Sequence, residues 1–435
     1  MKLTTYTVWI LVFSLSACTK SLVNIEAYSV SSELTLAYQD SQNNVSQLSI
    51  VPEIEAGLGE EVDLTASFRF RLDASNDLTP GEPSLDNYSS FSKPITLSDL
   101  GTIELRDFYI DYEFKNVDFR IGKQQIVWGE LEGFKNLDII NPQSFREFIL
   151  DDFDNSRISL WAFNSSFDLF GWNTDMFWSS DSSVHEIPSP QATFGLSAPR
   201  FNFNANSLNL SNIIINYPEN NSSNAVYGIR FKKYLKSGFD VALSYVSGID
   251  HSPVAYTINE TIERRQLIQE YRDRDVWGLN ITKAINSIVF RAEFGYRPKK
   301  SFSVISNNSL FIDERDQTVA AIGIDIDGPG RWFTNIQYLY DKVEDGDNSL
   351  VRPLEDKITT IYTRHSWLNE TLFFDIKWYS TNSFSDGLVK PEIRYLINDN
   401  ISASLGADAF YGDSDGTFGQ FKNNDRVVFK LQHIF

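Results

Sequence analysis

Apolar and polar residues alternate with a period of two through most of the chain. Clear examples are the segments 64–73 (LTASFRFRLD), 288–296 (IVFRAEFGY) and 401–411 (ISASLGADAFY). Such a pattern places apolar side chains on one face of an extended strand and polar side chains on the other. Most of these segments are about 9–13 residues long, whereas strands of globular proteins average five or six residues. About ten tilted residues cross a bilayer, so the pattern predicts transmembrane β-strands.

The connections between these segments alternate between short turns and long loops. Short turns are expected at 59–62, 115–117, 236–238, 285–287, 327–330, 368–370 and 398–400. Long loops are expected near 74–101, 129–156, 179–224, 248–274, 298–316, 342–356 and 412–425. This rhythm is typical of outer-membrane barrels, and a β-sandwich, the alternative fold, gives no reason for it. We therefore predict an all-β fold over residues 33–435, a closed antiparallel transmembrane β-barrel of about 18 strands. Its short turns would be periplasmic and its long loops extracellular, with 16 strands as the alternative count.

The C-terminal segment RVVFKLQHIF has the alternation of a strand up to its last residue. In a closed barrel this strand must pair with the first one, near 33–38, because an open edge would expose backbone groups to lipid. The ending also resembles the C-terminal signal that the barrel-assembly machinery reads. The residues that would carry this assembly signal are Phe429, Leu431 and Phe435.

The N-terminus has the features of an export signal. Lys2 supplies the positive region, and residues 8–15 (VWILVFSL) form a short apolar core. We predict a signal peptide over 1–17 and an N-terminal periplasmic tail over 18–32. Residues 15–18 (LSAC) resemble the bacterial lipobox, which makes Cys18 the candidate for lipidation. Ordinary cleavage after Ser16 is the alternative.

Composition excludes several classes of protein. The formal charge of −20 argues against a nucleic-acid partner, which a basic face would attract. After the N-terminus no apolar run is long enough for a spanning helix. The histidines lie far apart and lack metal-ligand spacing: His185, His251, His365 and His433. We expect no enzymatic activity, no metal and no cofactor.

Two places depart from regular alternation. Between Leu105 and Phe108 the apolar phase slips, which indicates a β-bulge. Lys123 falls on the same face as Phe119 and Ile121, and a lysine at the bilayer midplane costs roughly 2–4 kcal/mol. The sequence therefore predicts a phase change at Gly122 or a position near the rim.

The segment 120–161 carries a family resemblance. Its block GKQQIVWGE, followed by INPQSFREFILDDFDNSR, resembles a domain-of-unknown-function family of Gram-negative outer-membrane proteins. It is more loosely similar to alginate-export barrels. The stretches 216–231 and 416–435 fit the same family. The resemblance implies a barrel of the pore or transporter type.

The loop 129–156 is expected to contain a short amphipathic helix. Asn141 would cap it, Pro142 would occupy its first position, and Phe145, Phe148 and Ile149 would share one face. We expect this loop to fold into the lumen and narrow the pore; a helix lying over the outer rim is the alternative. The candidate constriction residues are Glu130, Glu132, Lys135, Asp138, Arg146, Glu147, Asp151, Asp152, Asp154 and Arg157.

Charged residues on the polar strand faces are the candidates for the pore lining. They are Arg69, Arg71, Arg230, Lys232, Arg291, Glu293, Asp375, Lys377, Arg394 and Lys430. With facing rows of opposite charge, such a lumen would select solutes by size and charge.

These features predict a porin-like channel or export pore of the bacterial outer membrane. It would pass hydrophilic solutes, anionic ones included, without a covalent step. The alternative is a plugged barrel whose long loops serve surface binding, adhesion or complex assembly. The expected partners are outer-membrane lipid, the barrel-assembly machinery, a small hydrophilic solute and, for an export pore, an inner-membrane export system.

Overall fold

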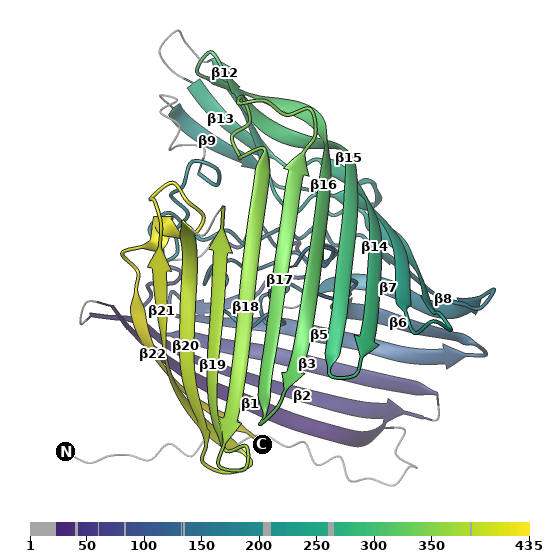
Figure 1. The fold of residues 1–435 in the computed structure, drawn as a ribbon. Coiled ribbons are helices and arrows are strands. Elements are labelled where there is room, and N and C mark those ends of the chain that lie inside the picture. The colour runs from purple at the N-terminus through teal and green to yellow at the C-terminus, as the bar shows by residue number, and fades with distance from the viewer. Residues whose placement is uncertain are drawn as a thin grey trace.

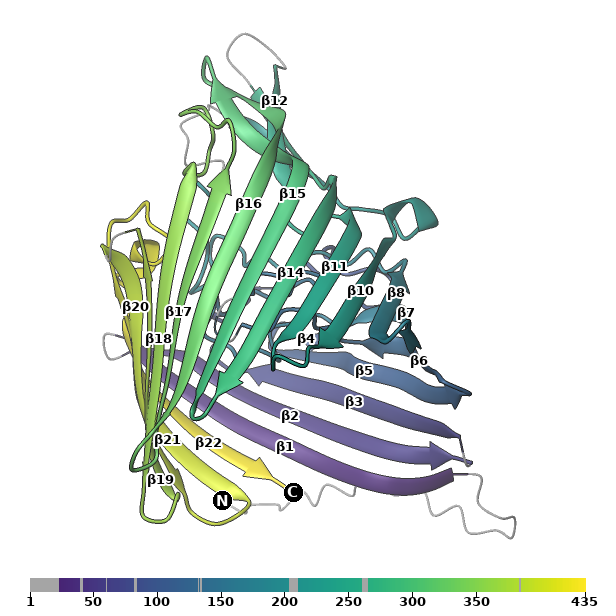
Figure 2. The same ribbon diagram turned by 45° about the vertical axis from the view of Figure 1, so that its right-hand side comes forward.

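The protein forms a closed antiparallel β-barrel (Figures 1 and 2). The computed structural model describes residues 23–39, 42–59, 61–81, 84–131, 133, 135–202, 210–259, 265–382 and 385–435. The predicted signal peptide, Cys18 and Glu132 lie outside these residues. In the described part, no helix is long and apolar enough to cross a membrane.

Eighteen of the described strands form the wall, which is the predicted number of strands. They are β1 (Val23–Gln39), β2 (Gln42–Leu58), β3 (Val62–Asp73), β5 (Gly101–Phe114), β6 (Val117–Gln124), β7 (Leu160–Leu169), β8 (Trp172–Ser179), β10 (Val226–Tyr234), β11 (Asp240–Ile249), β14 (Asp273–Ile285), β15 (Ile288–Ser306), β16 (Ser309–Gly328), β17 (Trp332–Val343), β18 (Glu355–Trp367), β19 (Leu372–Thr381), β20 (Asp386–Leu396), β21 (Ile401–Tyr411) and β22 (Arg426–Ile434).

The remaining elements lie in the loops. The short strand β4 (Ile95–Ser98) pairs with β5. Strands β9 (Leu210–Asn216), β12 (Val254–Asn259) and β13 (Arg265–Glu270) form a separate three-stranded sheet at the top of the view in Figure 1. Two 3-10 turns, η2 (Ser222–Asn224) and η3 (Gly419–Phe421), complete the described elements.

Strands β1 and β22 close the barrel. Leu34 pairs with Leu431, and Val30 exchanges two backbone hydrogen bonds of 3.0 Å with Phe435. The predicted pairing of the last strand with residues 33–38 is thus confirmed. However, β1 begins at Val23, so the described part of the predicted periplasmic tail is strand. These residues extend the barrel because they pair with β2, from Val23 opposite Leu58 onward.

The predicted long loop at 298–316 is wrong. Strands β15 and β16 stay paired up to Ser306 opposite Ser309. A bulge interrupts them, because Pro298 and Lys299 lie opposite a single residue, Asp316. This bulge shifts the period of two by one residue, which hid the continuation of both strands from sequence reasoning.

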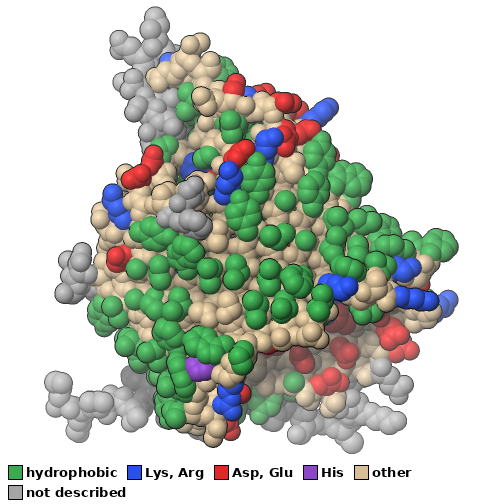
Figure 3. Space-filling model, in the orientation of Figure 1, with side chains coloured by type: hydrophobic (Ala, Val, Ile, Leu, Met, Phe, Trp, Pro, Cys, Tyr) green, Lys and Arg blue, Asp and Glu red, His purple; other side chains and the backbone are tan. Residues whose placement is uncertain are grey.

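The barrel carries apolar residues outside and polar residues inside. Trp277, Ile322 and Leu405 are 55–57% exposed on the outer face. Figure 3 shows hydrophobic side chains across the middle of the wall and charged side chains toward the rims. By contrast, Asn280 and Asn335 are buried on the inner face. This distribution is the reverse of that in a water-soluble protein, and it places the protein in the bacterial outer membrane.

Both irregular sites predicted from the sequence are present. Arg106 is the extra residue of a bulge in β5, opposite the step from Ser67 to Phe68. Gly122 has φ +134°, and Lys123, which follows it near the extracellular end of β6, is 1% exposed. The Lys123 ammonium donates a hydrogen bond of 3.4 Å to the Ser92 carbonyl, so it is shielded from lipid.

We expect Gly122→Ala to destabilise the barrel more than Gly330→Ala. A Cβ at Gly122 would lie 2.2 Å from the Phe108 carbonyl oxygen, and this backbone conformation costs other residues about 1–3 kcal/mol. Gly330 has φ +69° in a periplasmic turn, and a Cβ added there would have open space within 4 Å. Urea unfolding of the refolded barrels would compare the two. Equal unfolding midpoints would contradict the conformational role assigned to Gly122.

Candidate functional site

Residues 125–159, called here the lumen loop, enter the barrel interior where β6 ends. The carboxylate of Glu293 on β15 accepts hydrogen bonds from the backbone N–H groups of Glu130, Leu131 and Leu137, at 2.6, 3.1 and 3.1 Å. The Asn280 amide on β14 donates to the Trp128 carbonyl at 3.3 Å. Inward-facing side chains thus bind the first half of the loop.

Two arginines of the opposite wall bind the second half of the lumen loop. Arg106 donates to the carbonyl oxygens of Asn155 and Arg157, both at 2.9 Å. Arg69 on β3 donates to the same Asn155 carbonyl at 3.1 Å. The bulge in β5 positions Arg106 for these bonds, which satisfy backbone groups that would otherwise lack partners in the interior.

The tip of the lumen loop reaches the far side of the barrel. Lys390 on β20 donates to the Leu150 carbonyl at 3.3 Å, and Gln47 on β2 donates to the Glu147 carboxylate at 3.3 Å. Phe148 and Leu150 are buried in an apolar cluster with Phe418. The loop therefore crosses the lumen from β6 to β2 and β20.

The predicted amphipathic helix in this loop is wrong. Residues 146–149 form a turn, and Phe148 has φ +54°. Backbone N–H groups in the first turns of the predicted helix donate to other segments. That of Ser144 donates to the Ser156 carbonyl, and that of Phe145 donates to the Glu186 carbonyl. Phe145 packs on His185, apart from the cluster that holds Phe148, because tertiary contacts override the helical pattern.

Inward-facing glycines make room for the apolar side chains of the lumen loop. They lie on β10, β14, β15 and β16: Gly228, Gly278, Gly295 and Gly323. A Cβ at Gly295 would lie 3.0 Å from Leu137 Cδ2, and one at Gly323 would lie 2.9 Å from Leu131 Cδ2. We call these four glycines the glycine seat of the lumen loop. Sequence reasoning did not predict it, although a glycine inside a strand often marks the close approach of another segment.

One cavity of about 1140 Å³ extends past the lumen loop. Arg200 and Arg352 line it among the extracellular loops, whereas Arg364 and Arg394 line it toward the periplasmic ends of β18 and β20. The lumen loop forms one side of this cavity, and the wall from β15 to β22 forms much of the other.

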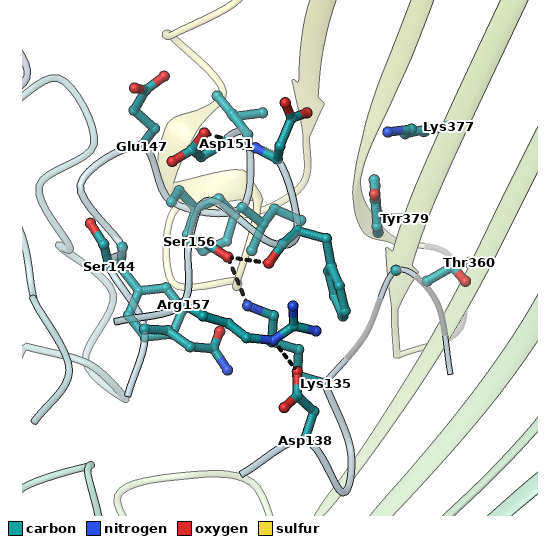
Figure 4. A pocket seen from close by; sticks show the side chains of 18 of the residues that line it. Lys135, Asp138, Ser144, Glu147, Asp151, Ser156, Arg157, Thr360, Lys377 and Tyr379 are labelled. Carbon is teal, nitrogen blue, oxygen red and sulfur yellow. Dashed lines mark hydrogen bonds and ion pairs between the residues drawn. The ribbon is translucent and has the colours of Figure 1, made fainter. Parts of the chain in front are cut away.

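The two sides of the cavity carry opposite net charge: acids outnumber Lys135 and Arg157 on the loop side, and bases outnumber the acids of β18 to β22, which are Asp375, Glu392 and Asp408. The acidic residues of the loop side are Glu130, Asp138, Glu147, Asp151, Asp152 and Asp154. The basic residues of β18 to β22, called here the basic row, are Arg364, Lys377, Lys390, Arg394, Arg426 and Lys430. Figure 4 shows Glu147 and Asp151 on the loop and Lys377 and Tyr379 across the pocket from them.

Four of the residues proposed from sequence as pore-lining border this cavity: Asp375, Lys377, Arg394 and Lys430. Asp375 pairs with Arg364 at 2.7 Å, and Lys430 with Glu33 at 3.3 Å. Within the described part of the chain, Lys377 and Arg394 form no ion pair; each lies near an aromatic ring, Lys377 at 5.5 Å and Arg394 at 4.8 Å from the centroid.

The other six proposed pore-lining residues do not border the cavity and bond within the wall or to the loop. Arg69 and Arg71 both lie close to Glu104, at 2.5 and 3.6 Å. Arg230 and Lys232 share Asp175, at 2.8 and 3.9 Å. Arg291 pairs with Asp325, and Glu293 holds the lumen loop as described above.

All described constriction candidates except Arg146 line the cavity. Arg146 lies 3.4 Å from Asp73 and 3.5 Å from Glu147, and Arg157 lies 2.7 Å from Asp138. Figure 4 also shows the Lys135 ammonium donating to the Ser156 hydroxyl, at 2.7 Å. Burial lowers the pKa of Lys135 to about 8.

The fold brings together two histidines that lie far apart in sequence. The rings of His185 and His251 are 5.6 Å apart. His185 Nδ1 accepts a hydrogen bond from the Gln143 N–H, and His251 Nε2 donates to the Ile140 carbonyl, both at 2.9 Å. Burial, and then the charge of Arg274, lowers the pKa of His251 to about 4. Burial, and then the charge of His251, also lowers the pKa of His185. Both rings thus favour the neutral form and bind backbone groups of the lumen loop.

Known structures of similar fold include three from Pseudomonas aeruginosa. OccK8 (OprE) has a TM-score of 0.52 and 10% identity, covering 94% of this chain and 97% of that one. OccK2 (OpdF), solved with glucuronate, has a TM-score of 0.52 and 9% identity, covering 94% of this chain and 97% of that one. OpdK, solved with vanillate, has a TM-score of 0.51 and 9% identity, covering 94% of this chain and 98% of that one. These likenesses show a porin-like barrel fold.

Sequence comparison identifies the family. No curated protein matches the chain. The family model described as protein of unknown function (DUF1302) matches residues 36–318, which is more than half of the 435 residues. The match includes the block at 120–161 that carries the resemblance seen in the sequence. The chain therefore belongs to the DUF1302 family.

Proposed function

We propose that this porin-like barrel is a channel or export pore for hydrophilic solutes, with a preference for anionic ones. The observation that supports this proposal is the cavity beside the lumen loop, bordered by Arg200 and Arg352 at one end and by Arg364 and Arg394 toward the other. An eighteen-strand barrel is wide enough to hold an aqueous passage. Solutes would diffuse through it past the lumen loop.

Selection in such a passage rests on size and on charge. The acidic side of the lumen loop and the basic row set up a field across the narrow part. Lys377 and Arg394 lack carboxylate partners among the described residues and are thus available to a passing anion. Two unit charges about 4 Å apart in water gain roughly 1 kcal/mol, which is enough to favour anions without trapping them. No covalent step is involved.

Two barrels of similar fold were solved with anionic solutes. OccK2 was solved in complex with glucuronate and OpdK with vanillate, and both solutes carry a carboxylate. A carboxylate is the kind of group that the basic row would attract. These two structures therefore agree with the preference proposed for this barrel.

Single-channel recording in a planar bilayer tests the proposal. The refolded, purified barrel should give stable openings with a higher permeability to chloride than to potassium. A barrel that inserts and keeps its heat-modifiable fold, but stays electrically silent, would contradict it.

A second candidate function is surface binding through the extracellular loops. It is favoured by the sheet of β9, β12 and β13, because two separate loops pair in parallel there. Ile213, Ile214 and Ile215 are 37–41% exposed on this sheet. Loops with such order and exposed apolar residues suit a binding surface. A silent barrel in the recording above would favour this role.

Reversing a charge of the basic row should reduce anion preference. We expect Lys377→Glu and Arg394→Glu each to lower the chloride-to-potassium permeability ratio about fivefold, equivalent to roughly 1 kcal/mol. Reversal potentials in a salt gradient measure this ratio. Lys115→Glu, in a periplasmic turn, is the matched control and should leave it nearly unchanged. Equal effects of all three changes would point to net charge instead of the basic row.

Filling the glycine seat should displace the lumen loop and widen the passage. A valine at Gly295 would collide with Leu137 of the lumen loop and with Val319 of the neighbouring strand. If the loop is the part that gives way, we expect Gly295→Val to raise single-channel conductance by up to about twofold. Ala292→Val, on the same strand facing outward, is the control. Unchanged conductance in a correctly folded Gly295→Val barrel would mean that the loop does not set the narrowest point.

A further inference from the structure

A second group of cations lines the cavity on its extracellular side, away from the basic row. It consists of Arg274 on β14 and of Arg297 and Lys300 on β15, around the carboxylate of Asp250. Asp250 bonds the Lys300 ammonium and lies 3.4 Å from Arg274. Arg297 has no carboxylate partner within the described chain. It donates to the Gln317 side chain at 3.1 Å and to the Asn136 carbonyl at 3.3 Å.

The bulge in β15 is what brings two of these cations to the same face. Residues three apart on a regular strand point to opposite faces. Because Pro298 and Lys299 together oppose one residue of β16, Arg297 and Lys300 both border the cavity. Lys299, inside the bulge, is exposed instead. Bulges often re-aim side chains at functional sites.

The charges of this cluster do not balance. Arg274 and Lys300 share the single carboxylate of Asp250 and Arg297 pairs with none, so the cluster of three cations and one carboxylate has a net charge of +2. The side chains of Arg274, Lys300 and Asp250 are only 8%, 14% and 8% exposed. The next carboxylate, Asp341, is bonded to Gln317 at 2.7 Å and to Arg352 at 3.0 Å.

Burying unpaired charge is costly unless a counter-ion compensates it. Arg297 Nε is buried without a hydrogen-bond partner, so one donor of this guanidinium remains unused. His185 and His251 border the same part of the cavity but are neutral and bonded to the lumen loop. They supply neither the missing negative charge nor further positive charge.

We propose that Arg274, Arg297 and Lys300 form an oxyanion-binding site, in which a carboxylate or phosphate group binds before it reaches the basic row. Arg297 would be its centre, because a guanidinium binds two oxygens of one oxyanion at once. The role of this site in solute passage rests on the proposed pore function. Its ability to bind an oxyanion is inferred from the charge imbalance alone.

Calorimetric titration of the full barrel in detergent at low ionic strength tests the site. The probes are inorganic phosphate and succinate. We expect both to bind, and Arg297→Gln to weaken both at least tenfold. Arg331→Gln, an equal loss of charge in a periplasmic turn, should bind as the wild type does. Equal affinities of Arg297→Gln and the wild type would overturn the proposal.

Further outcomes distinguish phosphate from carboxylate ligands. They also distinguish failure of the binding site from failure of the proposed pore. Binding of phosphate without succinate would overturn a site for carboxylate solutes and leave a site for phosphate. Arg297→Lys should recover part of the affinity, and Lys300→Gln replaces Arg297→Gln as the test if that variant fails to fold. A barrel that binds phosphate through Arg297 but never conducts would contradict the pore and not the site. A conducting barrel without oxyanion binding would contradict the site and not the pore.

Discussion

Every backbone polar group of a wall inside lipid must find its partner within the wall itself, and the pairing of β1 with β22 makes this possible. Without that pair, two strand edges would face hydrocarbon. Closure at eighteen strands then determines the rest, because a ring of this size cannot fill its interior with wall side chains alone. The space left inside is occupied by the lumen loop and by the cavity beside it.

The lumen loop and the wall are fitted to each other by two kinds of contact. Wall glycines accept Leu131 and Leu137 on one side. Glu293 on the same side, and Arg106 and Lys390 on other sides, bind backbone groups of the loop. Since these contacts use backbone atoms, the loop carboxylates still border the cavity, although Asp138, Glu147 and Asp151 also lie near arginines. The same segment is thus held firmly and still presents charge to the cavity.

Sequence reasoning succeeded where the information is local. The period of two predicted the strands, and its slips predicted the irregularities at Arg106 and Gly122. It failed where distant contacts decide. The helix predicted around Phe148 does not form, because nearby backbone N–H groups bond to Ser156 and Glu186 instead. The second half of β15 was predicted as a loop, because a bulge shifts its alternation. Among the charged candidates, alternation predicts the inner face but not the ion pairs that take Arg69 and Arg230 away from the cavity.

The route of the lumen loop also has a consequence for the order of assembly. The loop follows β6, yet it is held by Glu293 on β15 and by Lys390 on β20. Those strands come more than a hundred residues later in the chain, and contacts at such separation form slowly. The contacts between the lumen loop and the wall can therefore be completed only after nearly the whole wall is in place. Until β15 and β20 are in place, the lumen loop lacks the partners that bind its two halves.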